Sequence, residues 1–87
     1  MGKPESQRNE NVFRTMTPAH IREPPEADYI EVAFLESARF YRLFKRNPMY
    51  QQIVKMLRDA VSEERAVQVR CTSSESDVLA EVQDQKL

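Results

Sequence analysis

The 87-residue sequence has few of the residues on which common functional sites depend. It holds one cysteine (Cys71), one histidine (His20) and one glycine (Gly2), and it has no tryptophan. A single cysteine excludes an internal disulfide, and one cysteine with one histidine gives too few ligands for a zinc or blue-copper site. Phosphate-binding loops and the GxSxG and HExxH motifs are also missing. The sequence therefore predicts no catalytic residues, no metal site and no cofactor, and we expect that the chain is not an enzyme.

The overall charge favours neither nucleic acid nor a membrane surface. Thirteen Lys and Arg residues against 14 Asp and Glu residues give a net charge of −1, and the pI is about 5.8. No apolar run approaches the roughly 20 residues that a membrane-spanning helix needs. Together with the single cysteine, these features predict a cytoplasmic protein that does not contact membranes.

Proline separates a tail from a domain. Four of the five prolines (Pro4, Pro18, Pro24 and Pro25) lie in the first 26 residues, among few large apolar side chains. Such a composition cannot offset the entropy lost on ordering. We expect residues 1–26 to be largely disordered, with an edge strand possible at 11–17. A single domain is expected at 27–83, followed by a frayed terminus at 84–87.

The segment after the tail allows two interpretations. Ile30, Val32 and Phe34 alternate with polar or smaller residues, which is typical of a strand, and residues 38–44 could form a second strand after a tight turn. The alternative is one helix over 26–46, which would leave Val32, Leu35 and Leu43 in water. We favour two strands.

The following helix has the clearest pattern. Asn47 and Pro48 predict an N-cap and a first helical position. One apolar stripe follows and ends near Glu63; it comprises Tyr50, Ile53, Val54, Leu57, Ala60 and Val61.

Two strands are expected after the helix. Val67, Val69 and Cys71 alternate as inward positions, so the Cys71 thiol should be buried. The polar residues 72–77 are typical of a turn, and Val78, Ala80 and Val82 predict the inward face of a returning strand. His20 is expected to be a solvated tail residue.

This order of elements resembles small bacterial OB-fold-like β-barrel domains. The resemblance rests on Phe40-Tyr41-Arg42-Leu43, Asn47-Pro48-Met49-Tyr50, Ala60, Val67-Gln68-Val69 and Val78-Leu79-Ala80-Glu81-Val82. It implies an α+β, mostly β fold with one helix packed on it. Because Gly2 is the only glycine, no glycine is available for barrel bulges. We therefore expect either an open OB-like barrel or a ββαββ sheet.

Cations and aromatics gather in one segment, at Arg39, Phe40, Arg42, Phe44, Lys45 and Arg46. If Tyr41 and Leu43 point inward, then Phe40, Arg42 and Phe44 (the aromatic row) point outward; the opposite phase would bury an unpaired charge. We expect a small non-enzymatic binding module that contacts a protein partner or a second copy of itself through this row. The alternative is single-stranded nucleic-acid binding, since OB folds bind oligonucleotides on the corresponding strands.

Overall fold

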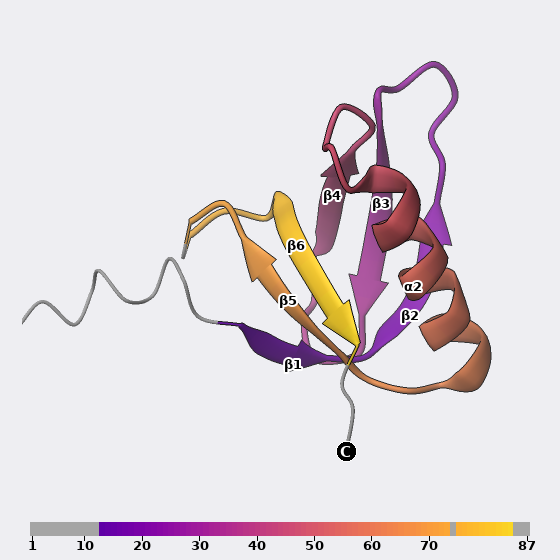
Figure 1. Ribbon diagram of the computed structural model, residues 1–87, viewed down its shortest axis with the longest axis vertical. Coiled ribbons are helices and arrows are strands. Elements are labelled where there is room, and N and C mark those ends of the chain that lie inside the picture. Colours follow the sequence, from indigo (N-terminus) through magenta and orange to yellow (C-terminus); the bar gives the residue numbers. More distant parts are fainter. Residues whose placement is uncertain (1–12, 74, 85–87) are drawn as a thin grey trace, which may run out of the picture.

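Six strands and one helix make up the part of the chain that the computed structural model describes, residues 13–73 and 75–84 (Figure 1). In chain order they are β1 (Arg14–Met16), β2 (Pro18–Arg22), β3 (Tyr29–Phe34), β4 (Phe40–Phe44), α2 (Tyr50–Glu63), β5 (Val67–Cys71) and β6 (Leu79–Asp84). In these residues no helix has the length and apolar character needed to cross a membrane.

The strands form two antiparallel three-stranded sheets, ordered β1-β5-β6 and β2-β3-β4. Thr17 alone separates β1 from β2, so one extended segment passes from the first sheet to the second. On the opposite side, the Arg42 N–H donates to the Asp77 carbonyl at 2.8 Å, and Arg42 forms a parallel bridge with Val78. The described residues thus form two antiparallel sheets and one helix without a closed barrel, which confirms the predicted α+β fold class.

Residues 29–44 are two paired strands, so the helical alternative for this segment is wrong. Ile30, Val32 and Phe34 of β3 point into the core, and Tyr41 and Leu43 of β4 do the same. A helix would have left part of this apolar set in water, whereas the strand pairing buries all of it on one face.

The helix begins two residues later than its sequence suggests. Asn47 and Pro48 form a turn in which the Asn47 side-chain oxygen accepts the Met49 N–H at 2.8 Å, and Met49 is the N-cap. The turn is held to β6 because the Asn47 amide also donates to the Ala80 carbonyl at 3.2 Å. The predicted end at Glu63 is confirmed.

The helix ends in a left-handed residue without glycine. Glu64 has φ 56°, its N–H donates to the Val61 carbonyl, and the Arg65 N–H donates to the Ala60 carbonyl at 3.0 Å. This hydrogen-bond pattern is a Schellman motif, in which glycine is the usual left-handed residue.

A bulge changes the phase of β6. Arg70 pairs with Glu81, but the next residue, Cys71, pairs with Leu79, so Ala80 is the extra residue. Leu79 and Val82 are therefore the buried pair, and the predicted inward set of Val78, Ala80 and Val82 is wrong for its first two members. Strict alternation fails wherever two residues oppose one.

The domain starts earlier than residue 27. Strand β1 falls within the segment expected as an edge strand, but β2 and its pairing with β3 were not predicted. Pro18 is buried as the first residue of β2, next to an irregularity in register, which is a position where a strand tolerates proline. Residues 1–10, where we expected disorder, lie outside the described residues, and so do residues 85–87 of the expected frayed terminus. Asp84, the first residue of that expected terminus, is the last residue of β6.

Both sheets and the helix contribute to one core. From the helix, Ile53, Leu57 and Ala60 are buried, and Tyr50 and Val54 pack at the edge of the core, as the stripe predicts. Val67, Val69 and Cys71 of β5 are buried on the inward face that their alternation indicates.

Candidate binding surface

The aromatic row lies on the outer face of the sheet β2-β3-β4. Phe40 is 39% exposed, Arg42 and Phe44 are partly exposed, and the intervening Tyr41 and Leu43 are buried. The orientation of the strand therefore places the charge of Arg42 at the surface, where water can solvate it.

Strand β3 extends the row sideways. Tyr29 lies opposite Phe44 and the two rings pack edge to face with centroids 5.5 Å apart. Ala33 lies opposite Phe40, whose ring is covered on one side by the Arg22 guanidinium at 4.7 Å. The outer face is thus a layer of aromatic rings and arginines that contact one another.

Acidic side chains pair with the arginines of this layer. The Arg22 Nε donates to Glu31 at 2.8 Å, and the Arg42 guanidinium donates to the Asp77 carboxylate at 3.1 Å. A charge that is already paired has less to gain from a phosphate, because binding must first break the existing pair. This pairing favours a surface that binds through its apolar groups.

The remaining cations lie at the two ends of β4. Arg46 covers the Phe44 ring at 4.6 Å and stands 3.7 Å from Asp28, whereas Arg39, at the other end of the strand, lies over the Tyr41 ring at 5.4 Å. Lys45 is exposed, and its backbone N–H donates to the Asp28 carbonyl. The six predicted residues therefore share one strand and its flanks, and Arg39 and Arg46 mark opposite ends.

A second feature of this surface, the exposed Leu35 at the β3–β4 turn, was not predicted from the sequence, although the tight turn itself was. Leu35, at the start of the turn, is 71% exposed. Among the described residues, the exposed large hydrophobic side chains are those of Leu35, Phe40 and Met49. The next residue, Glu36, accepts two hydrogen bonds from Thr17, which fix the turn against the corner between β1 and β2. The sequence did contain a signal for this feature, because Leu35 is a large apolar residue at a position where the alternation of β3 points outward.

The single thiol and imidazole occupy different sheets. Cys71 is buried in β5, and burial raises the pKa of its thiol, so the nucleophilic thiolate is disfavoured. His20 is exposed on β2, which is a strand of the other sheet. Within residues 13–73 and 75–84, no three His, Cys, Asp or Glu side chains come together as a metal site.

No protein-family model and no curated protein matches the sequence. The fold is similar to part of a pro-protein-glutaminase. That crystal structure superposes with a TM-score of 0.72 at 26% sequence identity, over 85% of this chain. The A47Q2 mutant of pro-protein-glutaminase gives a TM-score of 0.71 at 24% identity, over 86% of this chain. The chain spans about a quarter (26%) of the length of each of these structures.

This similarity contradicts the expectation that the chain is not an enzyme, because both similar structures are of an enzyme in its pro form. The expectation came from searching 87 residues for a complete set of catalytic groups. A domain that makes up one quarter of a larger enzyme precursor can belong to that enzyme while most reacting groups lie elsewhere in the protein, and composition alone does not reveal this.

Proposed function

We propose that this chain functions as a domain of the protein-glutaminase precursor type, and that it binds the catalytic part of such an enzyme. The observation that supports the proposal is the match of 85% of this chain to 26% of pro-protein-glutaminase. The matched part has the size of one small domain, and the rest of that protein is large enough to hold a separate catalytic unit.

The surface that we assign to this contact consists of the aromatic row and Leu35. Leu35 and Phe40 flank the same turn and are exposed, while the arginines between the rings are paired with Glu31 and Asp77. Exposed apolar side chains held by a rigid turn lose little entropy on binding and are typical anchors of protein interfaces.

The proposal is tested by isothermal titration of mature protein-glutaminase with the full chain. We expect a complex, and we expect Leu35→Ala and Phe40→Ala each to weaken it by about tenfold, as for anchor residues. Gln51→Ala, on the exposed side of α2, is the control and should bind like wild type. Absence of a complex, or equal affinity for all four proteins, would contradict the proposal.

Self-association through the same row is the competing arrangement. It predicts a dimer in sedimentation experiments that Phe40→Ala and Phe44→Ala convert to a monomer, without any complex with the glutaminase. The cytoplasmic location and the resemblance to OB-like domains stay predictions. The latter is supported by the position of α2 between the strand pairs β3-β4 and β5-β6.

A further inference from the structure

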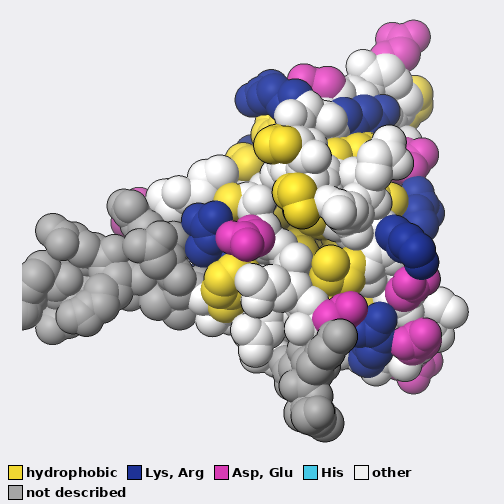
Figure 2. Space-filling model, viewed as in Figure 1, with side chains coloured by type: hydrophobic (Ala, Val, Ile, Leu, Met, Phe, Trp, Pro, Cys, Tyr) yellow, Lys and Arg dark blue, Asp and Glu magenta, His cyan; other side chains and the backbone are white. Residues whose placement is uncertain are grey.

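A groove of about 730 Å³ runs between the N-terminal half of α2 and β6. Its apolar walls are formed by Phe44, Met49, Ile53, Met56, Leu79 and Val82. Met49 is 48% exposed, and Figure 2 shows hydrophobic side chains along β6 and beside α2 on this face. A volume of this size accommodates one or two large side chains, and methionines adapt to irregular shapes.

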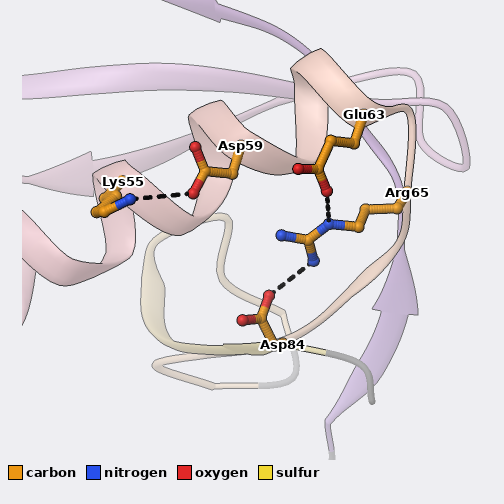
Figure 3. Close-up of polar contacts among 5 residues, drawn as sticks. All are labelled: Lys55, Asp59, Glu63, Arg65 and Asp84. Atoms are coloured by element: carbon orange, nitrogen blue, oxygen red, sulfur yellow. Dashed lines mark hydrogen bonds and ion pairs between the residues drawn. The ribbon is translucent and has the colours of Figure 1, made fainter. Parts of the chain in front are cut away.

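Two polar contacts fix the distance between the walls of the groove. At one end the Asn47 amide donates to the Ala80 carbonyl at 3.2 Å. Beyond the other end Arg65, just after α2, donates to Asp84 at the end of β6 at 2.7 Å and also contacts Glu63 (Figure 3). The groove is therefore preformed, which lowers the cost of filling it.

The β6 side of the groove carries an open backbone edge. After the bridge at Val78, no described strand pairs with the outer edge of β6, because β6 ends the sheet order β1-β5-β6. The Asn47 amide binds the Ala80 carbonyl at the start of this edge, and no described strand pairs with residues 81–84 on that side. An extended peptide segment is the ligand that can use such an edge.

The charge of the groove favours an acidic occupant. Arg46 and Glu81 are the charged residues in its lining, and Glu81 already pairs with Arg70 at 3.0 Å. Arg46 has a side chain that is 75% exposed and is 3.7 Å from Asp28, an exposed and weak pair. The positive charge of Arg46 is therefore the one that can pair with an acidic group of the ligand.

We propose that the α2–β6 groove binds a short extended segment of the partner protein, with a large apolar side chain in the groove and an acidic side chain beside Arg46. The inference rests on the proposed function only for the identity of the partner. Because Phe44 belongs both to the aromatic row and to the groove, the two surfaces adjoin and one partner can cover both.

The probe is an acetylated, amidated pentapeptide of sequence aspartate-phenylalanine-threonine-leucine-threonine, titrated into the ¹⁵N-labelled full chain. We expect the amide signals of Gln52, Met56 and Val82 to shift. A peptide with lysine in place of the aspartate should bind several-fold more weakly. Absence of shifts, equal affinity for the two peptides, or shifts confined to the outer face of β2-β3-β4 would overturn the proposal.

Two neighbouring glutamines provide a matched control. Gln52 is exposed and lines the groove, whereas Gln51 is exposed and does not line it. Gln52→Trp should obstruct the groove and lower the affinity for the acidic peptide by about tenfold. Gln51→Trp should leave this affinity unchanged. Met49→Ser removes an apolar wall just before α2 and should also weaken peptide binding, with the far-UV circular dichroism spectrum checking that the helix is retained.

Titration of the same variants with mature protein-glutaminase separates the two proposals. If the enzyme binds wild type and the Gln52→Trp variant equally but not the Phe40→Ala variant, the groove proposal fails and the proposed function stands. If the peptide occupies the groove but the enzyme does not bind wild type, the proposed function fails and the groove remains a peptide site.

Discussion

The Glu36 carboxylate accepts the backbone N–H of Thr17 at 2.7 Å and its hydroxyl at 2.9 Å. These two bonds join the β3–β4 turn, which carries Leu35, to the corner where the chain changes sheets. Burial would raise the pKa of Glu36, but the hydrogen bonds from Thr17 lower it below its ordinary value. The charged form is thus the one that holds the turn in place.

Acid should weaken this contact. Because the folded-state pKa of Glu36 is depressed, its stabilisation is present above the unfolded-state pKa and is lost as pH falls through the folded-state value. Glu36→Gln should therefore lose less stability than wild type between neutral and acidic pH, as measured by urea unfolding. Thr17→Val, which removes one donor, should give an intermediate dependence; identical pH profiles would show that the contact contributes nothing.

Leu57 is fully buried at the centre of the helix stripe. Leu57→Ala should lower the free energy of unfolding by roughly 2–5 kcal/mol, the range for a core leucine that leaves a cavity. Chemical denaturation measures the loss. Lys55→Ala, on the exposed side of the same helix, should change stability by less than about 1 kcal/mol. A loss for Leu57→Ala below that level would contradict the assigned core.

Cys71 should react slowly with thiol reagents in the native protein, because its side chain is buried and burial raises the pKa of the thiol. Adding denaturant should make the reaction fast. Gln51→Cys in a Cys71→Ser background gives an exposed thiol for comparison. Similar labelling rates for the two native proteins would mean that β5 opens readily.

Glycine at the helix end should stabilise the fold. Glu64 occupies the left-handed region at φ 56°, which costs a non-glycine residue about 1 kcal/mol. Glu64→Gly should recover up to about that amount. Ser62→Gly, two residues earlier within α2, should instead destabilise by roughly 0.5–1 kcal/mol. Thermal unfolding of both variants tests the opposite signs.

Nucleic acid should bind weakly if at all, because Asp77 and Glu31 already pair with arginines of the outer face. Titration of a fluorescent single-stranded oligonucleotide at several salt concentrations checks this. Tight binding at low salt, with a log–log salt slope reduced by about 0.7 in Arg42→Ala, would reverse the conclusion and support the alternative drawn from the sequence.

The sequence predicted most of the core because hydrophobic alternation and helical spacing were regular there. It failed where a local device interrupts the pattern: the bulge at Ala80, the irregular start of β2 at Pro18, and the Asn47 turn before the helix. Each depends on contacts with distant strands, which a local pattern does not contain.

The sequence predicted that Arg42 points outward, because burying its charge would be costly. It did not predict that Arg42 pairs with Asp77. The partners are 35 residues apart in the chain and meet only because β4 and the start of β6 form the second junction between the sheets. The groove beside β6 was missed for the same reason, since its walls come from elements that the sequence separates.

The pairing of Arg14 with Val69 has a consequence for biosynthesis. The partner of the first strand lies 55 residues later in the sequence, so a growing polypeptide cannot pair β1 until β5 has left the ribosome and cannot complete the sheet β1-β5-β6 until β6 has followed. Such distant pairings slow folding and leave strand edges exposed in the interim. We therefore expect β2, β3 and β4, which are consecutive, to assemble first, and the sheet β1-β5-β6 to form after them.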